Sequence, residues 1–212
     1  MNRARGRGVN NNAIVGKDTK VFLFDMGNVV VKGIGISRKI ANRLGVPHDQ
    51  FELDYHHWIY PLMEGEVTPG QYWHHAEKVF GRRIEEDLLA VCFTPYLNDE
   101  VADTIGRLRN LGYRVVCASN TYASHWEILR EMGVLSLFDA LYPSHEMGLT
   151  KPSHAYFRHI LEAEGIGADE AYFVDDSIEH VESARSLGIP ALHYSGEDAS
   201  CELQRVFEPL LG

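Results

Sequence analysis

The sequence predicts an α/β protein in which helices cover a mostly parallel β-sheet. From residue 20 onward, short apolar runs alternate with amphipathic segments, as in proteins built from strand–helix units. The apolar runs are nearly continuous, which is typical of strands that are buried on both faces. The interval from about 34 to 95 contains no convincing strand. These three observations predict a parallel sheet whose chain is interrupted by a helical insertion.

Five apolar runs are predicted to form the strands. The first run ends at Asp25, the second at Ser119, and the fourth at Asp175 and Asp176. The third run is the shortest, and the fifth is expected to close an edge of the sheet. The five runs are 20–25, 113–118, 140–142, 171–174 and 189–194.

Helices are predicted between the strands because apolar residues recur there at steps of three and four. The apolar stripes are Val101, Ile105 and Leu108, then Phe157, Ile160 and Leu161, then Ile178, Val181 and Ala184. A glycine follows each of four helical segments, where it favours a helix stop. These glycines are Gly112, Gly133, Gly165 and Gly188. Pro152 suits the first turn of the helix after Lys151.

The insertion is dense in aromatic residues and histidines. It is too long for a simple connection between a strand and a helix. Four short helices are expected in it, at roughly 36–44, 48–63, 68–80 and 84–92. The chain therefore divides into a flexible basic leader (1–19), a core domain (20–34 and 96–212) and an inserted helical domain (35–95).

Composition narrows the class of protein. The net charge of -10 argues against a dedicated nucleic-acid binder. No apolar run approaches the roughly 20 residues needed to cross a bilayer, and the leader lacks the apolar region of a secretory signal. Three scattered cysteines, expected to be small buried residues, indicate a reduced, cytoplasmic protein. No pattern indicates an oligomeric state.

The chemistry is expected at the carboxyl ends of the strands, where open parallel sheets bind their ligands. Asp25, Ser119 and the Asp175–Asp176 pair all stand there, and Lys151 adds a cation. Taken singly, an aspartate or serine at a strand end commonly caps a helix, and a lysine commonly lies on the surface. Two adjacent carboxylates repel each other without a cation, so the set favours a bound metal.

Four segments carry a family resemblance. Residues 24–30, 118–121, 148–152 and 173–177 match, in order, the four motifs of the haloacid dehalogenase-like hydrolase superfamily. The resemblance implies a Rossmann-like, doubly wound core with a type-1 helical cap domain inserted between the first two motifs. The Gly27-Asn28 pair resembles a subgroup of bacterial sugar-phosphate phosphatases, including those that act on glucose 1-phosphate.

This resemblance implies a Mg²⁺-dependent phosphatase that acts on a small phosphorylated metabolite, with a sugar phosphate as one candidate. Asp25 would attack phosphorus and form an aspartyl-phosphate. The implied metal ligands are Asp25, the carbonyl of Gly27, Asp175 and Asp176. The implied phosphoryl ligands are the amides of Met26, Gly27 and Asn120, the Ser119 hydroxyl and the Lys151 ammonium. Asp25, Ser119 and Lys151 form the expected catalytic set.

One position departs from the family pattern. Phosphatases of the superfamily usually carry a second aspartate, a general acid and base, where this chain has Gly27. Three explanations stay open: another donor such as His56, His57 or Glu64, a substrate with a good leaving group, or a loss of most activity.

Two other functions follow from the same departure. Haloacid dehalogenases also lack the second aspartate, but their fourth motif has no Asp-Asp pair, so Asp175 and Asp176 favour phosphate. A phosphate-sensing or partner-binding domain with weak activity is the non-enzymatic alternative. Trp58 or Trp73 is expected to cover the substrate, and Asn28 to be a turn residue with positive φ.

Overall fold

The structure is a computed structural model that describes residues 15–211. In those residues, five strands form one sheet in the order β5-β4-β1-β6-β7, and all neighbouring strands are parallel. The strands are β1 (Val21–Phe24), β4 (Arg114–Ser119), β5 (Ala140–Pro143), β6 (Ala171–Asp175) and β7 (Ala191–His193). Each coincides with one of the five predicted runs, although β4, β5 and β6 extend one residue beyond theirs. The prediction for the leader falls mostly on residues 1–14, which lie outside the described part of the chain.

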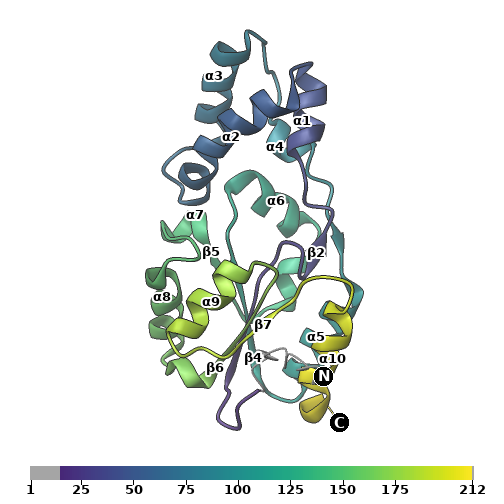
Figure 1. Cartoon of the computed structure of the whole chain (residues 1–212), viewed down its shortest axis with the longest axis vertical. Helices are drawn as coiled ribbons and strands as arrows, with labels where there is room; N and C mark the ends of the chain where they lie inside the picture. Colours follow the sequence, from purple (N-terminus) through teal and green to yellow (C-terminus); the bar gives the residue numbers. More distant parts are fainter. Residues whose placement is uncertain (1–14, 212) are drawn as a thin grey trace, which may run out of the picture.

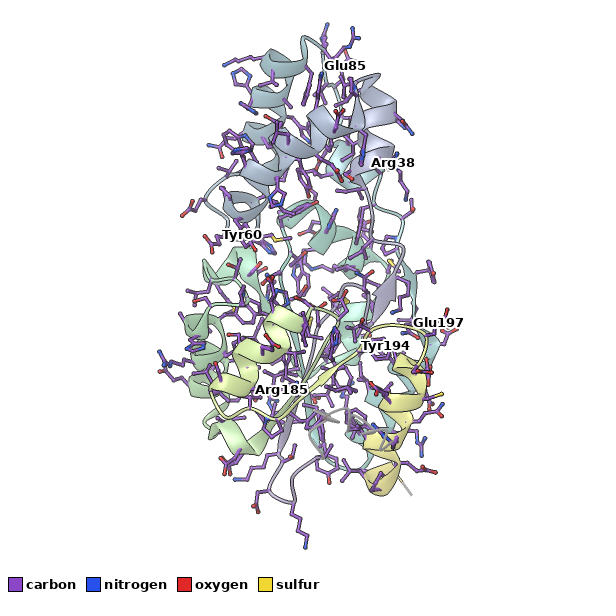
Figure 2. All side chains as sticks on the ribbon, in the orientation of Figure 1. Arg38, Tyr60, Glu85, Arg185, Tyr194 and Glu197 are labelled. Atoms are coloured by element: carbon purple, nitrogen blue, oxygen red, sulfur yellow. The ribbon has the colours of Figure 1, made fainter. Side chains whose placement is uncertain are left out.

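Side chains of each strand alternate between two apolar layers. Phe22 and Phe24 point into one layer, together with apolar residues of α5 (Asp99–Asn110), α6 (Ala123–Glu131) and α10 (Ala199–Leu211). Val21 and Leu23 point into the other, with residues of α8 (His154–Glu164) and α9 (Ile178–Ser186). Figure 1 shows the helices on the two sides of the sheet, and Figure 2 the side chains between them. Burial on both faces explains why the runs are apolar without interruption.

The strand order confirms the doubly wound fold. From β1 the chain continues to β4 and β5 on one side, and later returns to β6 and β7 on the other. The connections after β1 and β6 therefore diverge, and this switch point is where such sheets bind ligands. Asp25 follows β1, and Asp175 ends β6.

The helical insertion lies beyond the carboxyl edge of the sheet, facing α6 and α7 (Ser144–Met147) (Figure 1). Its helices are α1 (Ser37–Leu44), α2 (His48–Met63), α3 (Pro69–Phe80) and α4 (Leu88–Val91). The first three match their predicted ranges closely, and α4 is shorter than predicted. Thr68 and Gln71 form a capping box that fixes the start of α3, with Pro69 in its first turn.

Several elements have no counterpart among the predicted ones. Two-residue strands β2 (Val31–Lys32) and β3 (Tyr96–Leu97) pair antiparallel where the chain enters and leaves the helical insertion. Strands this short carry no measurable period of apolar residues, so the sequence does not reveal them. The others are α7, α10 and the 3₁₀ helices η1 (Val134–Leu137) and η2 (Ala168–Glu170).

The structure confirms some of the predictions for single glycines, prolines and cysteines and contradicts others. All four predicted stop glycines have positive φ. Pro152 is not in the first turn of α8, which begins at His154 and is capped by Ser153; the Lys151–Pro152 peptide is cis. Cys92 and Cys117 are buried as expected, but Cys201 is exposed because it lies on the outer face of α10. No helix in residues 15–211 is long and apolar enough to cross a membrane.

Candidate active site at the carboxyl edge of the sheet

Lys151 lies at the centre of the site. Its Nζ donates hydrogen bonds to Asp25 Oδ1 at 2.6 Å and to Asp175 Oδ2 at 2.6 Å. A third bond goes to the carbonyl oxygen of Ala118 at 2.7 Å. The Lys151 side chain is fully buried, so it is not an ordinary surface lysine. A buried ammonium with three oxygen partners is the arrangement that compensates its desolvation.

A third carboxylate completes the acidic cluster. Oxygens of Asp25, Asp175 and Asp176 all lie within 4.8 Å of one another. Asp176 is only half-buried, and its Oδ2 accepts a hydrogen bond of 2.9 Å from Asn28 Nδ2. Asn28 has φ 56°, which confirms the predicted turn residue and adds a contact that the sequence does not indicate.

Asp175 is held by two further groups. Its Oδ1 accepts a hydrogen bond of 2.8 Å from the Ser177 amide. The ring nitrogen Nδ1 of His180 lies 3.0 Å from the same oxygen. His180 is the principal site residue that the sequence analysis does not include. A lone histidine on the polar side of an amphipathic helix gives no signal, because the contact depends on how α9 leaves β6.

Charge and burial compete within this cluster. Burial raises the pKa of Asp25 to about 7, although the Lys151 ammonium opposes the change. Burial alone would lower the pKa of Lys151, but Asp175 and Asp25 outweigh it and raise that pKa. Burial would likewise raise the pKa of Asp175, yet Lys151 and His180 hold it below its usual value. A divalent cation beside Asp25 would favour the ionised carboxylate that a nucleophile requires.

Asn120 fixes the loop that carries Lys151. Its Oδ1 accepts from the Lys151 amide, and its Nδ2 donates to the Lys151 carbonyl oxygen, both at 2.8 Å. Ser119 ends β4 and is buried beside it. Helix α6 begins only at Ala123. Ser119 is therefore not its N-cap, the common role of a serine at a strand end, and the Asn120 amide does not lie at the start of this helix.

The turn after Asp25 places Met26 and Gly27 beside the acidic cluster. The Met26 carbonyl accepts hydrogen bonds from the amides of Val30 and Val31, which closes the turn. A Cβ atom at Gly27 would lie 3.9 Å from Asp25 Oδ2 but only 2.9 Å from Ile34 Cδ1. The end of the Ile34 side chain would therefore have to shift to admit a side chain at position 27.

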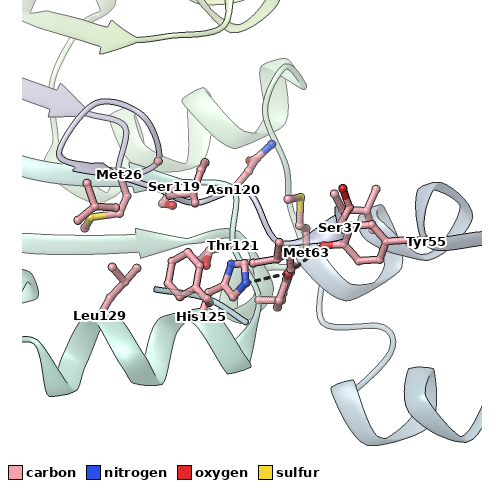
Figure 3. A pocket seen from close by; sticks show the side chains of 17 residues that line it. Met26, Ser37, Tyr55, Met63, Ser119, Asn120, Thr121, His125 and Leu129 are labelled. Carbon is pink, nitrogen blue, oxygen red and sulfur yellow. Dashed lines mark hydrogen bonds between the residues drawn. The ribbon is translucent and has the colours of Figure 1, made fainter. Parts of the chain in front are cut away.

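A cavity of about 270 Å³ opens between the core and the helical insertion. Met26, Gly27, Ser119 and Asn120 line it next to the acidic cluster, whose carboxylates are not among the lining residues, and helices α2 and α6 supply much of the remaining wall. Figure 3 shows Met26 and Ser119 on one side of this cavity and Ser37 and Tyr55 on the opposite side. All predicted phosphoryl ligands except Lys151, which is buried behind the cluster, line the cavity.

The histidines and tryptophans of the insertion that are predicted to serve the site do not line its cavity. His56 and His57 line an adjoining hollow with Asp49 and Glu52, which shares Ser37, Tyr55 and Ile59 with the cavity. Trp58 packs on Tyr72 and His75. Neither tryptophan is among the residues that line the cavity at the site, so the cavity gives no support to the expectation that one covers the substrate.

Trp73 and Glu64 have structural partners instead. Trp73 is buried, and its Nε1 donates to Asp87 Oδ1 at 2.7 Å. Glu64 Oε1 accepts a hydrogen bond of 2.7 Å from Thr150, the residue before Lys151. At the adjacent Gly65, a Cβ atom would clash with the carbonyl oxygen of His145. The insertion therefore contacts the core on the lysine-bearing side of the cavity.

Curated relatives match parts of the chain. It is 33% identical to the drimenol cyclase drtB of Aspergillus calidoustus over 51% of the chain and 20% of that protein. It is 31% identical to the sesquiterpene phosphatase astK of Aspergillus oryzae over 52% of the chain and 56% of that protein. A D-ribitol-5-phosphate phosphatase from Bacteroides thetaiotaomicron is 25% identical over 80% of the chain and 88% of its own length.

Solved structures share the fold. A HAD family enzyme from Bacteroides thetaiotaomicron, in complex with magnesium and inorganic phosphate, superimposes with a TM-score of 0.73 at 23% identity, covering 84% of this chain and 96% of that one. A predicted HAD-like hydrolase from Porphyromonas gingivalis gives 0.76 at 22% identity, covering 89% and 98%. The haloacid dehalogenase-like hydrolase family itself matches residues 19–188. The chain belongs to the haloacid dehalogenase-like hydrolase family.

Proposed function

We propose that this protein is a Mg²⁺-dependent phosphatase that hydrolyses a small phosphorylated metabolite through an aspartyl-phosphate on Asp25. The observation that carries the proposal is the buried Lys151, which bridges Asp25 and Asp175 beside a third carboxylate. A purely structural ion pair would not need a third acid, since Asp176 adds negative charge without another buried cation. An excess of carboxylates at a ligand-binding edge favours a role in catalysis.

The donor set suits a magnesium ion. Mg²⁺ prefers hard oxygen ligands and is usually held by one or two carboxylates together with phosphate and water. Asp25, the Gly27 carbonyl, Asp175 and Asp176 would hold it, with Asp176 the freest because Lys151 and His180 already contact Asp175. When bound, the ion would neutralise charge between the phosphate and the carboxylates.

The residues of the chain then divide the reaction into two steps. An Asp25 carboxylate oxygen attacks phosphorus, the bond from phosphorus to the ester oxygen breaks, and the leaving alcohol takes up a proton. Water next attacks the phosphorus of the acyl phosphate, which releases inorganic phosphate and restores the carboxylate. The Ser119 hydroxyl and the amides of Met26, Gly27 and Asn120 would bind the phosphoryl oxygens, and the Lys151 ammonium, whose donors already have three oxygen partners, would supply positive charge beside them.

Because position 27 is a glycine, the proton for the leaving group must come from another residue or must not be needed. His56 and His57 lie outside the lining of the cavity, which weakens them as donors. Glu64 contacts Thr150 and remains a candidate from the insertion. Gly27 itself supplies no side chain, so a substrate with a good leaving group is the alternative that needs no donor.

The insertion is proposed to act as a cap over the site, since its helix α2 lines the cavity. Closure of such an element excludes water from the reacting phosphate. The names of the relatives point in two directions for the substrate: one is a D-ribitol-5-phosphate phosphatase and another a sesquiterpene phosphatase. Sugar or polyol phosphates and apolar phosphates therefore both belong in a substrate screen.

A screen of phosphorylated metabolites in the presence of Mg²⁺ tests the proposal. We expect phosphate release that is abolished by EDTA and restored by excess Mg²⁺. Activity that persists in EDTA would contradict the mechanism. A phosphorylated ligand that raises the melting temperature without being hydrolysed would instead support the phosphate-sensing alternative, and release of halide from a haloacid would support a dehalogenase.

A further inference from the structure

The cavity at the site continues away from the acidic cluster as an apolar chamber. The described residues that line it include no aspartate, glutamate, lysine or arginine. His125 is the one among them whose side chain could carry a charge near neutral pH. The apolar wall combines the loop after β2, helix α2, the segment after α4, and helix α6. Its main contributors are Ile34, Ile36, Ile59, Met63, Phe93 and Leu129.

Three polar side chains in this wall are hydrogen-bonded to one another. Tyr55 Oη lies 2.8 Å from Tyr122 Oη, which lies 3.0 Å from His125 Nε2. Burial lowers the pKa of His125 to about 3, against the opposing effect of a hydrogen bond to the Leu89 backbone. The imidazole is therefore neutral near pH 7, and the two tyrosine hydroxyls and the His125 ring nitrogen form one hydrogen-bonded chain.

Ser37 is engaged in the same way. Its hydroxyl lies 3.0 Å from His48 Nε2 and 3.2 Å from Glu52 Oε1, both outside the chamber. A polyhydroxylated leaving group needs several donors and acceptors, and each of its hydroxyls costs free energy if it is buried without one. Away from Ser119, Asn120 and Thr121, the polar side chains of the chamber are already hydrogen-bonded to other protein groups.

The apolar wall reaches the reacting atoms at Gly27. A Cβ atom built at this residue would lie close to both Ile34 Cδ1 and Asp25 Oδ2. The Ile34 side chain therefore approaches the side of the site on which Asp25 Oδ2 lies. The leaving alcohol of a phosphate bound to Asp25 would therefore meet an aliphatic side chain where other members of the family place an acid. This contact joins the phosphoryl site and the chamber into one binding surface.

Resting on the proposed function, we infer that the substrate is a phosphate monoester of a hydrocarbon alcohol, whose apolar chain occupies this chamber. Its phosphate would lie at the Asp25 end, and its chain would extend past Ile34 towards Ile59 and Met63 on α2. Transfer of each methylene from water into such a chamber is favourable by about 0.8 kcal/mol, which corresponds to roughly a fourfold gain in affinity.

A homologous series of n-alkyl phosphates, from ethyl to octyl, tests the inference with Mg²⁺ present. These esters share nearly the same leaving-group chemistry, so chain length isolates the apolar contact. We expect kcat/KM to rise about three- to fourfold per methylene until the chamber is filled, and to exceed that for sugar and polyol phosphates. A flat series, or faster hydrolysis of polyol phosphates, would overturn the inference while leaving the phosphatase intact.

Binding of the matching n-alkylphosphonates, which cannot be hydrolysed at the same bond, gives a second readout. We expect the Kd to fall with chain length by the same factor; a Kd independent of length contradicts the inference even if no ester is turned over. Absence of turnover for every ester, together with length-dependent phosphonate binding, would refute the proposed function alone.

Two variants on helix α2 localise the effect. Met63→Gln places a polar amide in the chamber, and we expect it to lower octylphosphonate affinity roughly tenfold and to flatten the length series. Leu53→Gln is the matched control, because Leu53 lies on the same helix, is 68% exposed and does not line the chamber. Equal length dependence in both variants would place the alkyl chain elsewhere and overturn the inference.

Discussion

The two ends of the proposed site are built on opposite physical principles. At the polar end, Lys151 and three carboxylates lie beside the cavity at the carboxyl edge of the sheet, where ion pairs compensate burial. At the apolar end, which is the cavity itself, the helical insertion and α6 present aliphatic and aromatic side chains, and Tyr55, Tyr122 and His125 are hydrogen-bonded to one another. Under the proposed function, the core would supply the chemistry, and the contact between insertion and core would shape the environment of the leaving group.

At the polar end, substitution of the proposed nucleophile Asp25 is expected to have the largest effect on activity. Asp25→Asn retains the size of the side chain but removes the attacking carboxylate, so we expect kcat to fall by about 10⁴-fold or more. Initial rates of phosphate release measure the effect. A variant that keeps more than a tenth of the wild-type kcat would exclude Asp25 as the nucleophile.

Loss of the positive charge of Lys151 is expected to lower the stability of the fold. Lys151→Met leaves Asp25 and Asp175 buried without their common partner, which costs about 3–5 kcal/mol in the free energy of unfolding. Urea unfolding in EDTA measures this cost. Lys20→Met is the control, because the Lys20–Glu170 pair lies at the surface and its removal leaves the unfolding free energy nearly unchanged. A Lys151 variant as stable as the control would mean that the buried ion pair has been misassigned.

An acidic side chain can be introduced where the polar end of the site meets the apolar end. Gly27→Asp alone would meet Ile34 Cδ1, so we combine it with Ile34→Ala. Relative to Ile34→Ala, the double variant is expected to raise kcat for esters with poor leaving groups about 10²-fold, because it restores a proton donor. Circular dichroism checks that both variants fold. Unchanged kcat in a folded double variant would show that the missing acid does not limit this enzyme.

The apolar end carries its own signature in the pH dependence of stability. The pKa of His125 is lowered to about 3 by burial, below the ordinary value near 6.5. Below pH 6.5 the unfolded state therefore binds a proton that the folded state does not, and stability falls as the pH falls towards 3.

His125→Gln removes this titration. Between pH 6 and 4, we expect the unfolding free energy of the variant to depend on pH less steeply than that of the wild type, by about 1.4 kcal/mol per pH unit. Urea unfolding at several pH values measures both slopes. Parallel slopes would show that His125 titrates normally and that the chamber is wetter than described.

Prediction from sequence succeeds where a residue's role depends on its own strand. The apolar runs predict five strands, and Asp25, Ser119 and Asp175 come together because parallel strands share one carboxyl edge. Lys151 joins them from the neighbouring loop, held by Asn120.

It fails where two distant segments must first be placed against each other. His180 reaches Asp175 only through the path of α9, and Ile34 lies beside Gly27 only because the chain turns into the insertion there. The Tyr55–Tyr122–His125 chain joins the insertion to α6, which no local pattern indicates. For the same reason the tryptophans expected over the substrate pack inside the insertion instead.

The most direct test of the central claim is to trap the phosphoenzyme. The enzyme is mixed with a turned-over substrate and Mg²⁺, quenched, and treated with borohydride, which reduces an aspartyl-phosphate to homoserine. Mass spectrometry of the peptide that contains position 25 then locates the modification. We predict homoserine at position 25, dependent on substrate and Mg²⁺ and absent from Asp25→Asn. Homoserine at another aspartate, or none in an enzyme shown to turn over, would contradict the account.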